Sequence, residues 1–331
     1  MAVAGTVDPF RHEAVLYSGD DGFLERIVPF VRDGINAGEP TLVMTNVRKI
    51  AALRERLGGI EEDLVEYRDM EVVGANPARI IPAWGDFATR LSRNGARRLR
   101  GVGQPIWAGR TAAELAECHW HEALINRAFA NLRGFWLVCP YDVDALAPAV
   151  VDDARHTHPL IAGHDQSSSE EAYPLDNAAL IPARPLASAL EQPRSIVAEL
   201  GFDRDRLAEL RSLVATEGAR TGLSASQVDN LVVAVNEVAT NSVTHGGGIG
   251  VGRIWREDGA IVCEIRDAGV ITDPLVDRTR PSGAPTDARG LWTVNSVCDL
   301  VQLRSSSETG SVVRLRVQTQ GARQMHPPEA A

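Results

Sequence analysis

Three polar residues in the C-terminal half of the chain have the types and spacing that chemistry would need. Glu237, Asn241 and His245 stand at i, i+4 and i+8, so on a helix their side chains would share one face. A carboxylate can accept a proton from a nucleophile, and an amide oxygen is a hard ligand for Mg²⁺. The pattern is typical of magnesium-assisted phosphoryl transfer, although by itself it also fits a solvated polar face.

The surrounding sequence predicts the helix that would position these residues. Residues Ser224–Gly248 begin with a capping serine and end in three glycines, which favour a helix stop. Between them, apolar residues follow the three-four spacing of a buried face. These residues are Val228, Leu231, Val232, Val235 and Val238.

A second candidate group follows a pair of predicted strands, Ile249–Trp255 and Ala260–Arg266. The second strand runs into Asp267-Ala268-Gly269. A carboxylate there can accept a hydrogen bond from an exocyclic amine such as that of adenine. The glycine would let a ring approach the backbone.

A long irregular stretch, Val270–Ala288, separates these strands from a helix that is predicted to start at Arg289, Gly290 and Leu291. A glycine at a helix N-terminus, next to backbone N–H groups without helical partners, can seat a phosphate. Two more strands, Val301–Ser305 and Val312–Gln318, flank a turn at Gly310-Ser311.

The ordered motifs E-x-x-x-N, D-x-G, R-G-L and G-S resemble the four boxes of the GHKL ATP-binding fold. That superfamily includes histidine kinases, gyrase-type ATPases and anti-sigma-factor serine/threonine kinases. The segments VNEVATNSVTHGG and RGLWTVNSVCDLV are most similar to the last group. The resemblance covers about residues 190–320 and implies a Bergerat-type α/β sandwich that binds ATP and Mg²⁺.

The resemblance also implies roles for the candidate residues. Glu237 would be the general base, Asn241 the Mg²⁺ ligand, and Asp267 the adenine-reading carboxylate beside Gly269. The remaining boxes would flank the phosphates (Arg289, Gly290, Leu291) and close the adenine side (Gly310, Ser311). His245 stands where the family often has a basic residue near the phosphates. A histidine satisfied by carbonyls at the helix C-terminus is the other interpretation.

Two positions depart from the family pattern. Ile271 replaces the second glycine of the adenine box, and Ala288 replaces a glycine two positions before Gly290. Each change adds a side chain where close backbone approach or an unusual φ is expected. The departures bear on ATP affinity and kinase activity more than on the fold.

The N-terminal half alternates strand-like and helix-like segments over residues 12–156, which predicts a parallel α/β sheet covered by helices. The predicted strands are Ala14–Ser18, Pro40–Thr45 and Phe135–Cys139. The predicted helices are Gly22–Ala37, Val47–Leu57, Pro77–Ser92, Thr111–Ala130 and Asp144–His156. The turn after the first strand lacks the G-x-x-x-x-G-K-[ST] phosphate loop, so nucleotide hydrolysis is not expected here.

The segments HEAVLYSGDDGF, GEPTLVMTN, RGVGQPIWAGR, ECHWHEALINRAFA and CPYD resemble the MEDS sensory domain. The resemblance spans about residues 10–160 and implies that this half senses a small-molecule ligand. Polar and aromatic residues that could line a pocket are Trp107, His119, His121, Glu122 and Tyr141, although ordinary packing is the simpler interpretation. The four cysteines are scattered and are interpreted as small core residues.

Composition limits the partners that can be expected. A net charge of −10 and a pI near 5.3 argue against a nucleic-acid surface. The sequence has neither an apolar run long enough to span a membrane nor an N-terminal signal pattern, so we expect a cytoplasmic protein without a membrane partner. A homodimer is one arrangement that the sequence leaves open.

The organisation predicted from these patterns has four parts. A sensory domain (10–160) is followed by a Ser/Pro-rich linker (161–193), an ATP-binding domain (194–320) and a disordered tail (321–331). The leading hypothesis is a signal-responsive regulator that sequesters a sigma factor and phosphorylates a serine or threonine of a STAS-type anti-anti-sigma protein. A non-catalytic sequestering module, with or without ATP, is the alternative. A sensor histidine kinase is a third reading, which the missing phosphoacceptor hairpin disfavours.

Overall fold

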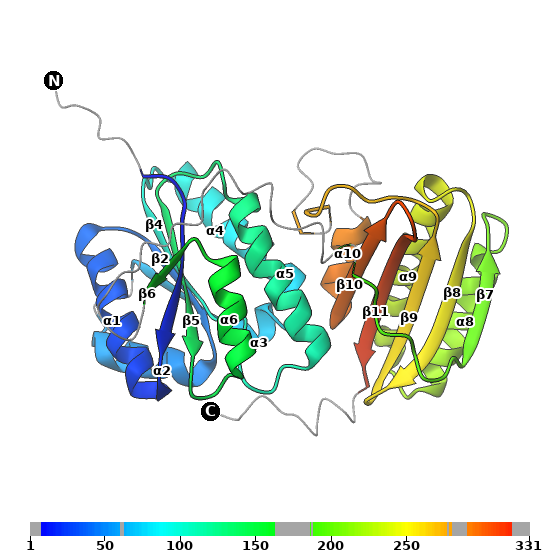
Figure 1. Cartoon of the computed structure of the whole chain (residues 1–331), viewed down its shortest axis with the longest axis horizontal. Coiled ribbons are helices and arrows are strands. Elements are labelled where there is room, and N and C mark those ends of the chain that lie inside the picture. Colours follow the sequence, from blue (N-terminus) through cyan, green and yellow to red (C-terminus); the bar gives the residue numbers. More distant parts are fainter. Residues whose placement is uncertain are drawn as a thin grey trace. The chain divides into compact units, whose positions relative to one another are not determined.

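The computed structural model describes residues 8–59, 63–162, 186, 188–276, 278–279 and 290–319. The chain divides into two compact units, with the division after Ile181. Each unit has its own sheet (Figure 1). Ala288 and Arg289, which the sequence places in the phosphate box, lie outside the described residues.

The N-terminal unit is built on a six-stranded sheet of order β3-β2-β4-β5-β1-β6, and every neighbouring pair of strands is parallel. The strands are β1 (Arg11–Tyr17), β2 (Thr41–Thr45), β3 (Val65–Asp69), β4 (Leu99–Gly103), β5 (Phe135–Asp142) and β6 (Leu160–Ala162). Strands β1, β2, β4 and β5 are buried along almost their whole length, as expected for a parallel sheet that is covered on both faces.

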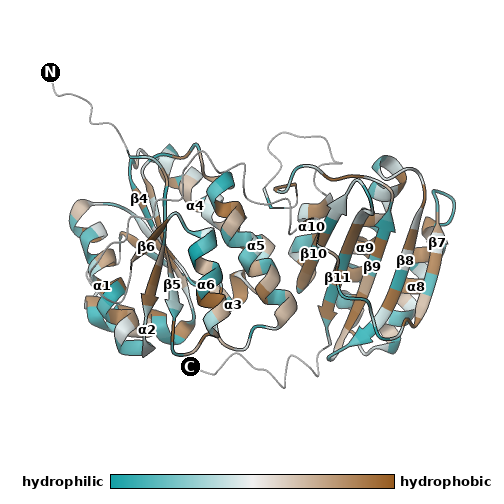
Figure 2. Ribbon diagram, viewed as in Figure 1, coloured by the Kyte–Doolittle hydropathy of each residue, from teal (hydrophilic) through white to brown (hydrophobic). Residues whose placement is uncertain are grey.

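Helices connect these strands and cover the sheet (Figure 1). They are α1 (Gly19–Ala37), α2 (Val47–Leu57), α3 (Met70–Val73), the 3₁₀ turn η1 (Pro77–Arg79), α4 (Ile80–Arg93), α5 (Ala112–Ala128) and α6 (Pro148–Thr157). The longer helices show both hydrophilic and hydrophobic turns in Figure 2, as expected for elements with one side against a sheet.

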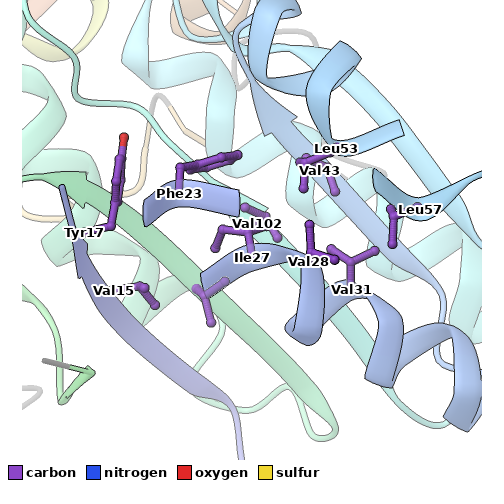
Figure 3. Close-up of a cluster of buried hydrophobic side chains, with 11 residues drawn as sticks. Val15, Tyr17, Phe23, Ile27, Val28, Val31, Val43, Leu53, Leu57 and Val102 are labelled. Carbon is purple, nitrogen blue, oxygen red and sulfur yellow. The ribbon is translucent and has the colours of Figure 1, made fainter. Parts of the chain in front are cut away.

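One hydrophobic cluster holds α1 and α2 against the sheet (Figure 3). Phe23, Ile27 and Val31 of α1 are fully buried there, beside strand residues such as Val43 and Val102. On the opposite face, the Trp84 ring of α4 packs directly on β4. A Cβ added to Gly101 or Gly103 would lie 2.9 Å from that ring. The glycines of β4 therefore make room for tryptophan.

The C-terminal unit is built on a five-stranded antiparallel sheet of order β10-β11-β9-β8-β7. Its strands are β7 (Ala198–Phe202), β8 (Gly250–Glu257), β9 (Ala260–Asp267), β10 (Leu300–Ser306) and β11 (Gly310–Gln318). Its helices are α8 (Leu207–Arg220), α9 (Ala225–His245) and α10 (Gly290–Val297). Helix α9 packs between α8 and α10 and rests on β8, β9 and β11.

The start and the end of α9 follow from local sequence. Ser224 and Gln227 form a reciprocal capping box, and the Gln227 amide also donates to the Gln318 carbonyl oxygen, 2.9 Å away. The helix ends at His245, and the glycines that follow adopt positive φ at Gly247 and Gly248. Leu231, Val235 and Val238 of the predicted apolar stripe are fully buried, whereas Val228 and Val232 are only partly buried.

The predicted fold class is confirmed: a parallel α/β unit is followed by an antiparallel sheet layered with helices. Elements absent from the prediction are β3, α3, β4, β6, β7 and α8. The predicted helix from Asp144 begins at Pro148, where the proline occupies the first helical position. Within the described residues, none of the helices has the length and apolar character needed to cross a membrane.

Candidate functional site

Glu237 and Asn241 lie on the side of α9 that faces the first turn of α10. Both side chains are partly buried, one helical turn apart. The close neighbour from α10 is Gly290, which is buried. A Cβ added to Gly290 would lie 2.9 Å from Glu237 Oε2 and 3.4 Å from Asn241 Nδ2. The absence of a side chain at Gly290 therefore lets the backbone of α10 approach this carboxylate and this amide.

This approach joins three features that suit a metal-bound polyphosphate. The first turn of a helix leaves its backbone N–H groups without acceptors in the helix and carries partial positive charge. In α10 this turn begins at Gly290 and Leu291. A carboxylate and an amide oxygen beside it supply hard ligands for a divalent cation. The donor set fits Mg²⁺, which Asn241 would hold beside a bound phosphate group.

Asp267, the last residue of β9, is held at both carboxylate oxygens. Ser242 Oγ donates to Oδ2 at 2.6 Å, and the backbone N–H of Gly269 donates to Oδ1 at 2.7 Å. Ser242 is buried and follows Asn241 directly in α9. Each carboxylate oxygen keeps a further lone pair, so Asp267 can still accept a hydrogen bond from a ligand amine.

Three glycines pack backbone closely around Asp267. A Cβ on Gly246 would lie 2.5 Å from Asp267 Cγ, and a Cβ on Gly269 would lie 2.8 Å from Gly246 Cα. Gly310 has φ +72° and approaches the Asp267 carbonyl so closely that a Cβ would lie 2.0 Å from its oxygen. A side chain at any of these positions would displace the carboxylate or the strand that carries it.

A serine network continues from the surroundings of Asp267 into β10 and β11. Ser311 Oγ donates to the Gly269 carbonyl oxygen at 2.8 Å and lies 2.9 Å from Ser305 Oγ. Ser305 Oγ accepts the backbone N–H of Ile271 at 2.8 Å. Ile271 does not adopt positive φ, so the isoleucine at this family glycine position causes no backbone strain. What the departure adds is a half-buried side chain.

The structure thus places the sequence-predicted residues in two linked groups. One contains Glu237, Asn241, Gly290 and Leu291, and the other contains Asp267, Gly269, Gly310 and Ser311. Ser242, beside Asn241 in α9, links them through its hydrogen bond to Asp267.

Three further residues lie at the C-terminal end of α9 or directly after it. His245 is exposed at the last position of α9. Among the described residues, no side chain that could help it to bind an anion contacts its imidazole. Sequence reasoning missed Ser242 and Gly246. Their signal was available, because both fall within one turn of the predicted residues Asn241 and His245.

In the N-terminal unit the pocket candidates do not gather into one site. Trp107 stacks under the Arg110 guanidinium, 3.6 Å from its ring centroid. His119 pairs with Asp153 at 3.3 Å. His121 is fully buried.

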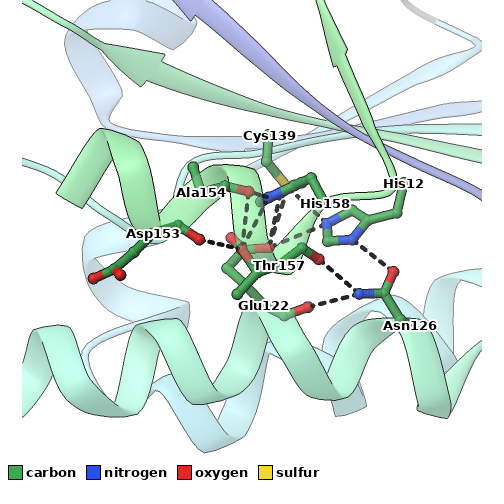
Figure 4. A network of polar contacts seen from close by, with 8 residues as sticks. All are labelled: His12, Glu122, Asn126, Cys139, Asp153, Ala154, Thr157 and His158. Atoms are coloured by element: carbon green, nitrogen blue, oxygen red, sulfur yellow. Dashed lines mark hydrogen bonds and ion pairs between the residues drawn. The ribbon is translucent and has the colours of Figure 1, made fainter. Parts of the chain in front are cut away.

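Glu122 and Tyr141 belong to different surroundings from those three residues. Glu122 lies in a polar cluster with His12 and His158 (Figure 4), and the Tyr141 ring meets the His158 ring edge-on. Glu122 is fully buried, as ordinary packing would have it, but its neighbours are polar. All four cysteines are buried as expected, yet Cys139 also contacts this cluster.

Comparison with known families agrees with the two-unit division. Residues 11–159 match the model of the MEDS domain, described as the methanogen/methylotroph, DcmR sensory domain. Residues 201–317 match the model of the histidine kinase-like ATPase domain. No curated protein matches the chain. An ATPase domain of this kind beside a sensory domain indicates an ATP-binding regulatory function.

Proposed function

We propose that this chain is a signal-responsive protein kinase that transfers the γ-phosphoryl group of ATP to a serine or threonine of an anti-anti-sigma protein and sequesters a sigma factor. The observation that carries the catalytic part is the approach of Gly290 to Glu237 and Asn241. This approach supports a site in which the phosphate, the cation and the general base lie next to one another. The sigma-related partners rest on the sequence resemblance to anti-sigma-factor kinases.

The residues of the site would divide the work as follows. Asn241 would hold Mg²⁺, which supplies charge neutralisation for the phosphates when it is bound. The first turn of α10 would receive phosphate oxygens, and Asp267 would accept a hydrogen bond from the adenine amine. Glu237 would accept the proton of the attacking hydroxyl as the new O–P bond forms and the bond to the β-phosphate oxygen breaks. Little other chemistry is required, because positioning and electrostatics supply most of the rate in phosphoryl transfer.

A histidine kinase is a less suitable interpretation of the same ATPase domain. The pair His121-Glu122 imitates the start of a phosphoacceptor motif. His121 is 1% exposed on α5, so its imidazole is not presented to an incoming phosphoryl group.

A non-catalytic sequestering module is the second candidate, and Ile271 is the observation that favours it. Its half-buried side chain stands at the adenine box, where the resemblance implies a glycine. The kinase and the sequestering module share the fold and the partner. The kinase transfers a phosphoryl group, whereas the sequestering module does not and acts with or without bound ATP.

Single-turnover phosphorylation assays with Glu237→Ala separate these two functions. If Glu237 is the base, the variant should bind Mg-ATP nearly as the parent does and lose about a hundredfold or more of the transfer rate. Asn241→Ala should instead lose Mg²⁺-dependent ATP binding. Asp229→Ala, at an exposed position on the same helix, is the matched control and should behave as the parent in both assays.

The candidate substrates and sigma factors would be those encoded near this chain. Parent protein that inhibits a sigma factor but phosphorylates none of these partners would establish the sequestering module. Parent protein that neither binds ATP nor inhibits a sigma factor would remove both functions.

A further inference from the structure

Four side chains with metal-ligating atoms meet inside the N-terminal unit. They are His12 of β1, Glu122 of α5, Cys139 of β5 and His158 just before β6, and their exposed fractions lie between 0 and 2%. Their candidate ligand atoms all lie within 4.8 Å of one another. Figure 4 shows the two imidazoles and the carboxylate converging between the helices and the sheet.

Four of the six separations between ligand atoms are close to those around a four-coordinate ion. Glu122 Oε2 lies 3.1 Å from His12 Nε2, 3.3 Å from His158 Nε2 and 3.6 Å from Cys139 Sγ. His12 Nε2 lies 3.3 Å from Cys139 Sγ. Zinc bonds of about 2.0–2.3 Å in tetrahedral geometry place ligand atoms about 3.3–3.8 Å apart.

Hydrogen bonds outside the cluster fix which nitrogen of each imidazole carries hydrogen. The Asn126 amide nitrogen faces two carbonyl oxygens, those of Thr157 at 2.7 Å and Glu122 at 3.4 Å. Its oxygen therefore faces His12 Nδ1 at 3.0 Å, and Nδ1 must donate. His158 Nδ1 lies 2.9 Å from the Ala154 carbonyl oxygen, which can only accept.

When both imidazoles are neutral, each directs a lone pair from Nε2 at Glu122 Oε2. Two nitrogen lone pairs that face a carboxylate oxygen in a fully buried site are unfavourable, and a metal cation bound between them would satisfy all three groups. A divalent ion with Glu122 and a Cys139 thiolate gives zero net charge, and oxygen acceptors behind both histidines form the outer shell typical of zinc sites.

We propose that His12, Glu122, Cys139 and His158 bind one divalent transition-metal ion, with Zn²⁺ the ion that fits this donor set. Two imidazoles, one carboxylate and one thiolate suit zinc better than calcium or magnesium, which take oxygen ligands. Four protein ligands close the coordination shell, as in structural zinc sites. The ion would tie α5 to β1, β5 and the segment that leads into β6.

Metal uptake by the full chain tests this assignment. Protein stripped with a chelator and dialysed should bind one equivalent of Zn²⁺ and unfold at a higher temperature when Zn²⁺ is present. Co²⁺ in place of Zn²⁺ should give the intense visible absorption of a tetrahedral site, with a thiolate-to-cobalt charge-transfer band. A folded parent chain that takes up neither ion would overturn the proposal.

Matched substitutions locate the ion. Cys139→Ser should lose the charge-transfer band, whereas Cys118→Ser should keep it, because Cys118 is equally buried in the same unit and donates to the Pro105 carbonyl oxygen instead. His158→Gln should lose stoichiometric binding, and His121→Gln should retain it. If a cluster variant fails to fold, X-ray absorption of the zinc-loaded parent decides the matter. A first shell without one sulfur and two imidazoles would refute the assignment.

Discussion

Ser242 of α9 donates a 2.6 Å hydrogen bond to the carboxylate of Asp267 at the end of β9. This bond couples the helix that carries Glu237 and Asn241 to the strand whose carboxylate is proposed to read the base. The two groups of candidate residues are therefore linked by this hydrogen bond, in addition to the close packing of Gly246 on Asp267. Movement of one group would disturb the other.

Ser242→Ala tests this coupling. The substitution leaves one oxygen of a partly buried carboxylate without its donor, and a hydrogen bond to a charged group contributes about 1.5–3 kcal/mol. We expect ATP affinity to fall by about tenfold, as measured by calorimetry. Ser212→Ala removes a serine hydroxyl that bonds only the carbonyl four residues earlier, at 3.0 Å, and should leave affinity unchanged. Equal behaviour of the two variants would show that Asp267 does not depend on Ser242.

Asp267→Asn changes the hydrogen-bonding character of the base-reading group. A carboxylate only accepts, whereas an amide also donates, so the variant should lose preference for the exocyclic amine of adenine over the carbonyl of guanine. Competition binding with ATP and GTP measures this preference. An unchanged ATP-to-GTP ratio would mean that another group reads the base.

Gly290→Ala tests the approach of α10 to α9. Its Cβ would press on Glu237 Oε2 at 2.9 Å and on Asn241 Nδ2 at 3.4 Å. We expect Mg-ATP affinity to fall by about tenfold or more, since overpacking of this kind typically costs about 1–3 kcal/mol. Gly218→Ala, in α8, is the control, because its Cβ would meet its nearest atom at 3.4 Å, in Val228. ATP binding by Gly290→Ala at the parental level would place the phosphates elsewhere.

Gly310→Ala should destabilise the C-terminal unit rather than alter ligand binding alone. Gly310 combines φ +72° with a Cβ position 2.0 Å from the Asp267 carbonyl oxygen. Gly222 also has positive φ, +86°, but open space around its Cβ position. Gly222→Ala should therefore show only the left-handed penalty of about 1–2 kcal/mol, and Gly310→Ala a clearly larger loss in urea unfolding. Equal losses would mean that strand β11 can shift to relieve the contact.

Lys49 is the only lysine in the chain and gives a pH prediction for the N-terminal unit. Its Nζ donates to Tyr17 Oη at 2.6 Å and to Gln104 Oε1 at 3.1 Å. Burial lowers the pKa of Lys49 from its ordinary value, an effect that Asp142 and Asp20 partly oppose. NMR of protein labelled at lysine Nζ should show one signal that titrates at lower pH in the folded chain than in urea.

The sign of the stability effect follows from this shift. Between the lowered folded pKa and the unfolded value of about 10.4, the unfolded chain binds more protons, so stability should rise with pH across that window. Lys49→Met should lack this contribution when urea unfolding is compared at several pH values. A lysine signal that titrates identically in folded and unfolded chains would contradict the prediction.

Local sequence was sufficient for the elements whose signals are local. Helix α9 could be bounded by its capping serine and its terminal glycines, and Asp267 could be placed at a strand end by the turn residues before that strand. Strand β4 was missed because Gly101 and Gly103 lower its strand propensity. These positions lack side chains because the ring of Trp84 packs against them, and Trp84 belongs to a helix that precedes them in the chain.

The site residues divide in the same way. Glu237 and Asn241 lie on one helix, so their spacing in the sequence predicts that their side chains share one face. The cluster of His12, Glu122, Cys139 and His158 draws on two strands, a helix and a loop spread along the whole N-terminal unit. Only the sheet order brings these residues together, and no spacing rule applied to the sequence could have paired them.

Strand β1 lies between β5 and β6, which are the last two strands of its unit to be synthesised. Contacts between such distant parts of the chain form slowly, because the entropy cost of closing a long loop comes before either strand pair forms its stabilising contacts. Strand β1, the first strand of this unit to be synthesised, therefore stays unpaired along both edges until almost the entire unit has been synthesised. Fragments that end before β5 leave this apolar strand unpaired, so the N-terminal unit should be unusually dependent on chaperones during translation.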